Sequence, residues 1–345
     1  MPTNVTSSFT DSTSSDAIQS FFNRRLLMRA TYDHFGMMLA TAKPLALRQG
    51  KNMIFRRFAR HTAQTTALTE AVTPTPLSKS KTDVAIAISL YGGYMVNSDV
   101  LDLTQPEGLL DDVDQLAQNM GETMDVLHLR EWANGTNITY ANGAGETSVN
   151  TLSVYEDWDK ALRNLVNNKA KRTTPKIAPS QQIGTGSIMP GYWCLLSNSL
   201  FYDIRAGSTF AGKFFLPSNY GNSAAITGEG GALDVGIRLL PIPDADALLG
   251  ELIVEGGGAT GGDAAVIAET SNVADVHYGV IIGQEAMGTV SLGGKGQGGI
   301  IRKGLGTAGT DDPLEQRCTI GWKKFNGRGL FNQAFVQTVK AATAL

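Results

Sequence analysis

Two glycine-rich strings are the first candidates for chemistry, because glycine lets a backbone approach phosphate groups closely. Residues 304–309 read Gly-Leu-Gly-Thr-Ala-Gly after a predicted strand, which matches a dinucleotide fingerprint. That site also needs a helix whose N-terminus meets the pyrophosphate. Residues 310–313 are instead Thr-Asp-Asp-Pro, and more strand follows. Residues 293–296, Gly-Gly-Lys-Gly, lack the earlier glycine and the following Ser or Thr of a phosphate loop. Neither string predicts a nucleotide site.

The side chains that could act as nucleophiles, acids or metal ligands are scattered. None of the histidines has a second His or a Cys at metal-ligand spacing: His34, His61, His128 and His277. Neighbouring acids such as Asp111 and Asp112 are adjacent in sequence, so their side chains diverge rather than converge on a substrate. Cys194 and Cys318 are expected to be small apolar fillers rather than a disulfide. We therefore predict no catalytic, cofactor-binding or metal-binding residue and no enzyme.

Charge is distributed unevenly along the 345 residues. Residues 1–81 carry 11 Lys or Arg and 4 Asp or Glu, a net charge of +7, whereas residues 82–345 carry 18 and 28, a net charge of −10. A basic part can bind nucleic acid or the acidic part of another copy, although both parts can also be ordinary solvated surfaces. No apolar run is long enough to span a membrane, and the Ser/Thr-rich start does not match a secretion signal, so no membrane partner is expected.

A long acidic helix is the strongest secondary-structure prediction. Between residues 107 and 133, apolar residues recur every three or four positions and form one stripe: Leu109, Leu110, Val113, Leu116, Met120, Met124, Leu127 and Trp132. Other positions carry acids, including Asp111, Asp112, Asp114 and Asp125. At 1.5 Å per residue the helix would be roughly 40 Å long. We expect a half-buried rod on which the rest of the chain is arranged.

The first 50 residues predict an arm followed by a helix. Residues 1–15 have no core-forming pattern, and residues 16–42 show helical spacing that Lys43-Pro44 would end. Arg24, Arg25 and Arg29 lie together on this helix. They would contact nucleic acid or an acidic neighbour, or simply form a solvated face.

Two predicted strands, residues 51–58 and 83–96, are separated by a segment of about 25 residues that is rich in Thr, Ala and Pro. A structureless loop of this length is uncommon inside a compact domain. The conflict disappears if the hairpin projects from its own domain and rests on another subunit. Its basic residues are Arg56, Arg57, Arg60, Lys79 and Lys81.

The remainder predicts a mixture of helices and strands, with most glycines after residue 183. Helices are expected at residues 153–168 and 198–206, and strands at 191–196, 276–283, 299–303, 319–325 and 330–340.

Several strings resemble major capsid proteins of tailed bacteriophages with the Hong Kong 97-type fold, and look closest to the branch typified by the podophage N-four. They are Leu68–Pro74 (LTEAVTP), Tyr91–Tyr94 (YGGY) with Ser98–Leu101, Asn134–Thr136 with Tyr140–Gly143, Tyr278–Gly283 (YGVIIG) and, most specifically, Gly304–Lys323. The matching part covers about residues 45–325. Residues 207–275 and the N-terminal arm match weakly.

The resemblance implies an α+β fold with an N-terminal arm (1–50), an extended β-hairpin loop (51–98), a peripheral domain (99–151) with a spine helix (107–133), an axial domain (152–301) and closing strands of the peripheral domain (302–345). It also implies self-assembly into pentamers and hexamers of an icosahedral head around double-stranded DNA. Implied partners are a portal protein at one vertex and scaffolding and decoration proteins. The implied location is the virion, after assembly in the host cytoplasm.

Two contacts are hypothesised within such a shell. The basic loop, through Arg56, Arg57, Arg60, Lys79 and Lys81, would lie over the acidic helix of a neighbour, through Asp111, Asp112 and Asp114. Each exposed pair would contribute only about 0–1 kcal/mol, so many copies would be needed. Arg24, Arg25 and Arg29 would face the interior, near DNA phosphates or an acidic neighbour. The alternatives are a protein-loading nanocompartment shell of the same fold class and a two-domain soluble enzyme.

Overall fold

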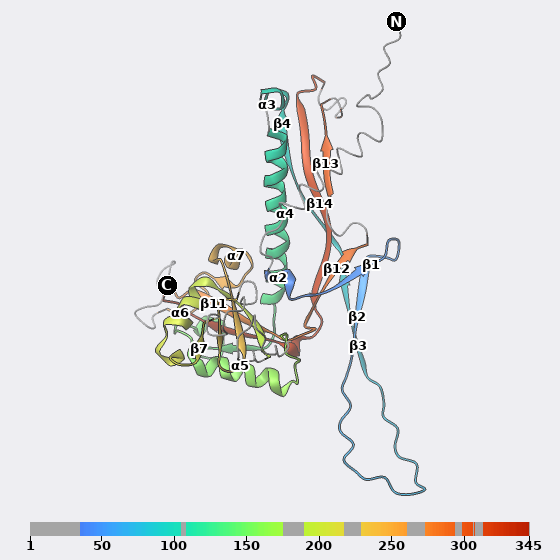
Figure 1. Cartoon of the computed structure of the whole chain (residues 1–345), viewed down its shortest axis with the longest axis vertical. Coiled ribbons are helices and arrows are strands. Elements are labelled where there is room, and N and C mark those ends of the chain that lie inside the picture. The colour runs from blue at the N-terminus through green and yellow to red at the C-terminus, as the bar shows by residue number, and fades with distance from the viewer. Residues whose placement is uncertain are drawn as a thin grey trace, which may run out of the picture.

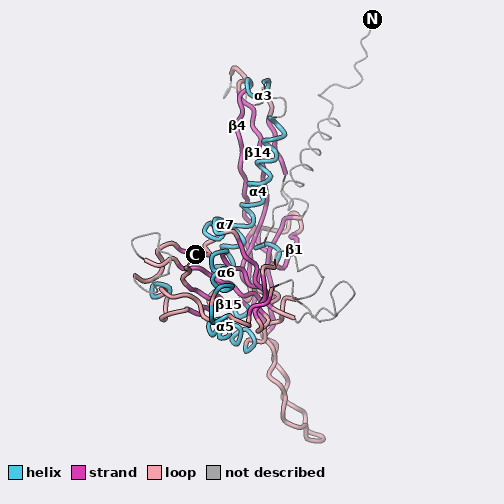
Figure 2. Tube along the Cα trace, turned by 60° about the vertical axis from the view of Figure 1, so that its left-hand side comes forward, coloured by secondary structure: helices cyan, strands magenta, loops and turns pink. Residues whose placement is uncertain are grey.

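The computed structural model describes residues 35–104, 108–174, 190–216, 229–260, 273–293, 299–305, 307 and 313–344. Within these ranges the chain forms a tall body of strands beside one long helix, a globular unit at the lower end of that helix, and a narrow hairpin that projects away from both (Figure 1). The same three parts are separate in the rotated view of Figure 2. The predicted α+β character is thus visible in the arrangement of the elements.

The long helix, α4 (Gly108–Ala133), confirms the helix predicted at residues 107–133. Its apolar stripe is shared between two cores. Val113 and Met120 pack in one cluster with Trp322 of the tall sheet, whereas Leu129 and Trp132 are fully buried in the core of the globular unit. One rigid element therefore fixes the sheet and the globular unit relative to each other.

The tall body contains a five-stranded sheet whose central strand is β14 (Arg317–Leu330). Along one side β14 pairs with β4 (Ser89–Ser98), and along the other with β13 (Gly299–Lys303) and then β12 (Met287–Leu292). A parallel strand, β1 (Thr41–Leu45), flanks β12. A short helix, α2 (Phe35–Met38), precedes β1. A second short helix, α3 (Asp99–Thr104), links β4 to α4. The sheet covers the apolar stripe of the upper part of α4.

The projecting hairpin consists of β2 (Asn52–Phe58) and β3 (Lys81–Ala87), which pair antiparallel. Only Ile88 separates β3 from β4, so the hairpin and the tall sheet share almost one continuous strand. Phe55 and Ile86 are buried at the root of the hairpin. Residues 59–80 form neither helix nor strand and are exposed throughout. The predicted strands and their projection from the body are therefore confirmed.

The globular unit contains an eight-stranded sheet in the order β5-β15-β11-β6-β9-β8-β7, with β10 also paired to β11. The strands are β5 (Ile138–Tyr140), β6 (Tyr192–Ser197), β7 (Phe214–Phe215), β8 (Gly231–Leu233), β9 (Ile237–Ile242), β10 (Ile253–Val254), β11 (Val276–Ile282) and β15 (Val336–Ala341). The helices are α5 (Tyr155–Asn167), α6 (Asn198–Ala206) and α7 (Asp244–Leu249), with 3-10 turns at Glu146–Ser148, Ser208–Phe210 and Gln333–Phe335.

Both faces of this sheet are buried. Along β6, Tyr192 and Cys194 point into a cluster with α5 and α6, while Trp193 and Leu195 point into the cluster that contains Trp132 of α4. Strands buried on both faces are apolar at every position instead of alternating. Cys194 and Cys318 are buried and form no disulfide, which confirms that they are small core residues rather than a bridge.

Three expectations from the sequence need correction. The helix predicted to reach residue 42 ends at Met38, because Thr41 and Pro44 favour extended backbone and β1 pairs with β12. The grouping of residues 302–345 as closing strands of one domain is wrong for β15, which lies in the eight-stranded sheet beside β11. Conversely, β12 and the first three residues of β13 fall within the range 152–301 expected for the axial domain, but both strands belong to the five-stranded sheet. Which sheet a strand joins is decided by long-range pairing, which no local pattern reveals.

Candidate inter-subunit interface

The basic residues at the root of the hairpin mostly contact their own chain. Arg56 donates from Nε to Asp83 Oδ1 at 2.7 Å and from Nη2 to Oδ2 at 3.0 Å, because the register places these two residues directly opposite each other. Lys81 Nζ lies 3.8 Å from the same carboxylate. The hydrogen bond from Arg56 lowers the pKa of Asp83. This exposed group of charges is therefore satisfied within one copy.

The other three basic residues also have contacts within the chain. Arg57 donates to the side-chain oxygen of the buried Asn332. Arg60 donates from Nη2 to the backbone oxygen of Lys169 at 3.4 Å. Lys79 Nζ lies 4.2 Å from the centre of the Phe58 ring. Beyond this root the loop carries no Lys or Arg between residues 62 and 78. The positive charge is thus a property of the root and not of the loop tip.

The acids hypothesised as their partners lie near the N-terminal end of α4. Asp111 is exposed, Asp112 accepts a hydrogen bond from the Asn97 side chain, and Asp114 is half-buried. Acids in the first turns of a helix are also favoured by its dipole. Figure 1 places this end of α4 at the opposite end of the body from the hairpin. The structure therefore does not bring the two sets together within one copy, and their pairing between copies stays a prediction.

Arg24, Arg25 and Arg29, the hypothesised interior-facing residues, lie outside the described residues.

Asp125 differs from the other acids of α4, although the sequence placed it on their exposed face. Only 2% of its surface is exposed, and its Oδ1 accepts a hydrogen bond of 2.8 Å from the backbone N–H of Gly36. Trp132 Nε1 donates to Gly36 O at 2.9 Å, so α2 is held against α4 from two sides. His128 is buried below, with Nδ1 2.7 Å from Met124 O and Nε2 3.1 Å from Thr289 Oγ1. This is a packing site, in which both ring nitrogens of the buried His128 have hydrogen-bond partners.

Burial raises the pKa of Asp125 to about 6, although hydrogen bonds from Gly36 and Met37 oppose the shift. A pKa raised in the folded state gives a stability contribution that is full below about pH 4 and is lost as the pH rises through 6. Asp125→Asn removes this titration and keeps an oxygen acceptor for Gly36. We expect the variant to gain up to about 3 kcal/mol relative to the unaltered chain between pH 4 and pH 7. Urea unfolding at both pH values measures this, and a difference independent of pH would contradict it.

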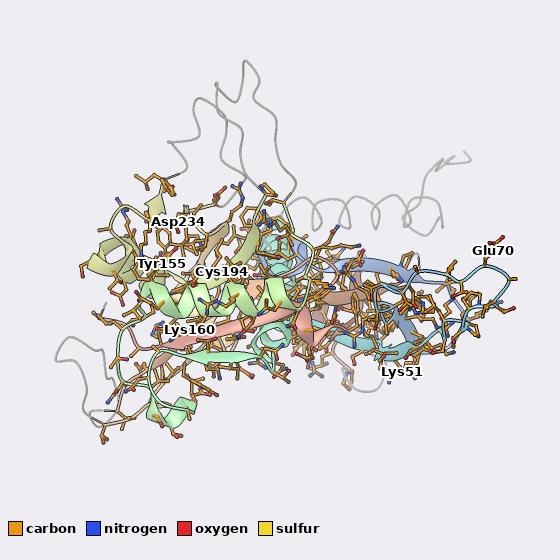
Figure 3. The ribbon with its side chains drawn as sticks, turned by 90° about the horizontal axis from the view of Figure 1, so that it is seen from below. Lys51, Glu70, Tyr155, Lys160, Cys194 and Asp234 are labelled. Atoms are coloured by element: carbon orange, nitrogen blue, oxygen red, sulfur yellow. The ribbon has the colours of Figure 1, made fainter. Side chains whose placement is uncertain are left out.

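The loop tip carries large apolar residues whose exposure no sequence pattern indicated. Leu68, Val72 and Leu77 are all exposed, and Leu68 is 78% exposed. Figure 3 shows Glu70, between the first two, at the end of the hairpin farthest from the globular unit. Exposed large apolar side chains on a projecting loop indicate a contact with another molecule. The signal was present in the sequence as LTEAV, but only the projection makes its exposure apparent.

The described ranges contain neither a candidate metal site nor a membrane-spanning helix. No group of three or more His, Cys, Asp or Glu side chains there is placed to hold a metal ion. No helix in the same ranges has the length and apolarity that crossing a bilayer requires.

Solved structures of phage capsids match this chain over most of its length. The capsid of Ralstonia phage GP4 matches with a TM-score of 0.64 at 10% identity, over 88% of this chain and 87% of that one. The acid-stable capsid of Helicobacter pylori bacteriophage KHP30 matches with a TM-score of 0.58 at 12% identity, over 90% and 92%. The capsid of cyanophage P-SCSP1u matches with a TM-score of 0.55 at 14% identity, over 88% and 87%.

The chain has the phage capsid fold. The α+β, Hong Kong 97-type architecture expected from the sequence is therefore confirmed. No family model and no curated protein sequence matches the chain. At these identities the matches establish the fold, whereas the N-four-like branch stays a prediction. The assignment of α4 as the spine helix and of β2–β3 as the extended loop stays a prediction.

Proposed function

We propose that this chain is the major capsid protein of a tailed bacteriophage, which assembles as pentamers and hexamers into an icosahedral head around double-stranded DNA. The observation that supports this most is that the capsid fold extends over nearly the whole of this chain and of the capsid chains that it matches. The projecting hairpin with its exposed apolar tip supports self-association, because such a tip is stabilised only by burial against another molecule.

The proposed domain division follows the sheets. The peripheral domain would contain α4 and the five-stranded sheet with β1 and β4, and the axial domain would contain the eight-stranded sheet with β15. The extended loop would then be residues 51–87, because β4 belongs to the sheet, and the arm would comprise the residues before β1. The protein would be located in the virion, after assembly in the host cytoplasm. A portal protein at one vertex and scaffolding and decoration proteins are the further partners proposed.

Electron microscopy of the purified full chain tests the proposal. Icosahedral particles of uniform size are expected, alone or after co-expression with the other head proteins of the same genome. A chain that stays monomeric under every condition, including co-expression, would contradict it. The nanocompartment alternative predicts particles filled with protein cargo. Particles isolated from infected cells distinguish the two: a DNA-filled head has a higher ratio of absorbance at 260 nm to absorbance at 280 nm than a protein-filled shell.

Charge contacts between copies are a second proposal, now centred on Arg60 and Asp111. Asp111 is exposed, and the only contact found for Arg60 in the described chain is a long one, to a backbone oxygen, so both charges remain accessible to a neighbour. We expect Asp111→Asn and Arg60→Gln each to weaken assembly at low salt, with an effect that fades above about 0.5 M salt because exposed charges are screened. Light scattering during assembly at several salt concentrations measures this. If assembly of both variants had the same salt dependence as assembly of the unaltered chain, the proposed contact between Arg60 and Asp111 would be wrong.

Contact with packaged DNA is proposed for Arg24, Arg25 and Arg29. Such contacts would be to phosphates and independent of sequence. Replacing all three with Gln should lower the salt concentration at which the assembled protein releases non-specific duplex DNA. The same release profile for the variant would leave contact with an acidic neighbour as their role.

A further inference from the structure

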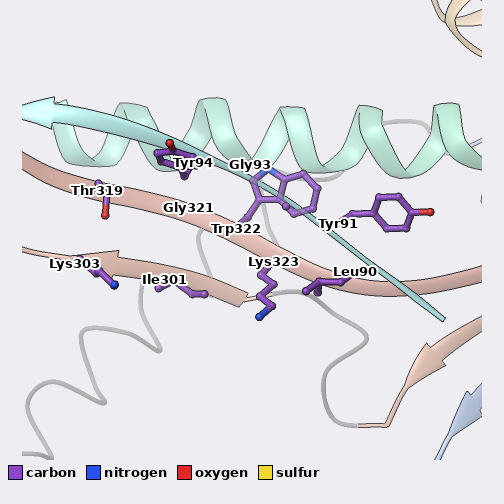
Figure 4. Close-up of a pocket in the computed structure, with 11 residues that line it drawn as sticks. Leu90, Tyr91, Gly93, Tyr94, Ile301, Lys303, Thr319, Gly321, Trp322 and Lys323 are labelled. Carbon is purple, nitrogen blue, oxygen red and sulfur yellow. The ribbon is translucent and has the colours of Figure 1, made fainter. Parts of the chain in front are cut away.

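The face of the five-stranded sheet that points away from α4 carries an apolar hollow. Side chains alternate along β14, so that Ile320 and Trp322 are buried against α4 while Gly321 faces the other way. Gly321 pairs directly with Tyr94 of β4 and with Ile301 of β13. Figure 4 shows the hollow across these three strands, and its volume is about 440 Å³.

Two glycines create the floor of this hollow. Gly92 and Gly321 leave the backbone bare, and neither position has room for a side chain. A Cβ at Gly321 would lie 2.8 Å from Tyr94 Cβ, and one at Gly92 would lie 2.7 Å from the backbone oxygen of Trp322. The floor is therefore fixed by the close approach of β4 and β14.

The walls are apolar and the rim is cationic. Leu90, Tyr94 and Ile301 are the walls, and Tyr94 is 74% exposed. Lys303 and Lys323, both exposed, also line the hollow. An apolar face that the described residues leave exposed indicates a contact site. A segment that binds here should carry a carboxylate to pair with the lysines. It should also carry a large aliphatic side chain to fill the apolar hollow.

The loop tip has this chemistry. Leu68 and Val72 are exposed, and Glu70 between them is the only acid in residues 59–80. The backbone N–H of Val72 donates to Thr69 O at 3.2 Å, and Ala71 has a φ of 63°. This tight turn presents Leu68, Glu70 and Val72 together at the end of the hairpin.

The tip and the hollow of one copy are too far apart to meet. In Figure 1 the loop extends below the body, whereas β4, β13 and β14 extend above the root of the hairpin. The root itself is fixed to the sheet by the buried Phe55 and Ile86, so the hairpin does not fold back. Within the described chain the loop tip therefore cannot reach its own hollow, and a tip that occupies the hollow comes from another copy.

We propose that the loop tip of one copy docks in the hollow of a second copy, with Leu68 on the glycine floor and the Glu70 carboxylate between Lys303 and Lys323. This inference rests on the proposed self-assembly and identifies the surface that the loop recognises. The charge at the tip is the opposite of the charge expected for the loop, whereas the contact proposed for Arg60 concerns the root. An apolar, acidic tip meets a cationic rim, while the basic residues remain at the root.

Cross-linking tests the contact directly. The chain carrying Leu68→Cys and Ile301→Cys is assembled, oxidised and separated without reductant. Both native cysteines are buried, so they do not compete. A ladder of covalently linked copies is expected. Leu68→Cys combined with Val166→Cys is the matched control, because Val166 of α5 is 51% exposed but lies on the globular unit. Assembled particles of the first variant without a ladder, or with no more than the control, would overturn the proposal.

A charge exchange tests the role of the rim. Glu70→Lys alone and Lys303→Glu with Lys323→Glu should each lower particle yield about tenfold, because like charges then face each other across the contact. The triple variant should return to within about twofold of the unaltered chain, since the attraction is restored with reversed signs. Glu255→Lys, an exposed acid of the globular unit, should leave the yield unchanged. A triple variant no better than Glu70→Lys would overturn the charge pairing.

These outcomes are distinct from failure of the proposed function. If the unaltered chain forms no particles even with the other head proteins, the proposed self-assembly is wrong, and the proposed docking is wrong as well. If the unaltered chain assembles but shows neither the ladder nor the rescue, only the docking is wrong.

Discussion

Replacing Trp132 with Ala is expected to destabilise the chain by about 3–5 kcal/mol, the cost of removing a fully buried large side chain. Trp132 lies in the core of the globular unit, and its indole also donates to Gly36 O. Chemical denaturation followed by circular dichroism measures the loss. Because α4 belongs to both cores, amide exchange should also become faster in residues 317–326 of the tall sheet.

Two control variants separate the causes. Trp132→Phe keeps an aromatic ring but leaves Gly36 O without its donor, so a loss of about 1–3 kcal/mol is expected. Val166→Ala, at an exposed position of α5, should change stability by less than about 0.5 kcal/mol. A Trp132→Ala variant as stable as Val166→Ala would show that α4 does not join the two cores.

Phe55→Ala is expected to release the hairpin from the body and to reduce particle yield at least about tenfold, because the docking element loses its fixed direction. Phe55 is buried at the root, stacks on Phe331 with ring centres 5.2 Å apart, and covers Gly288, where a Cβ would lie 2.5 Å from its ring. The local cost is about 3–5 kcal/mol. Amide exchange of residues 52–58 and 81–87 should become at least about a hundredfold faster.

The matched control for Phe55 is Ile54, the next residue of β2, whose side chain is exposed on the opposite face. Ile54→Ala should leave exchange at the hairpin root nearly unchanged. If Phe55→Ala assembled as efficiently as the unaltered chain, the fixed direction of the hairpin would have no part in assembly.

The sequence revealed the elements with strong local periodicity. The helix at residues 107–133 could be predicted because three- and four-residue spacing persists over seven turns. The hairpin could be predicted because alternating strands flank a segment without a core-forming pattern. The capsid fold followed from strings of residues and not from periodicity.

Properties that depend on register and burial could not be predicted. Arg56 pairs with Asp83 because of a strand register that a 22-residue intervening loop leaves open. Asp125 is buried because α2 crosses α4 at that point, and nothing in the spacing of the acids indicates it. The hollow needs three strands from distant parts of the chain. The charge hypothesis therefore identified residues of the right type but not their surroundings.

The near-continuity of β3 and β4 has a mechanical consequence. Only Ile88 lies between the strand that leads to the loop tip and the strand that carries Leu90 and Tyr94. If the tip docks as proposed, a pull on the docked tip would reach the hollow of the same subunit through this one covalent segment. The two contacts of a subunit, through its tip and through its hollow, would then be mechanically coupled.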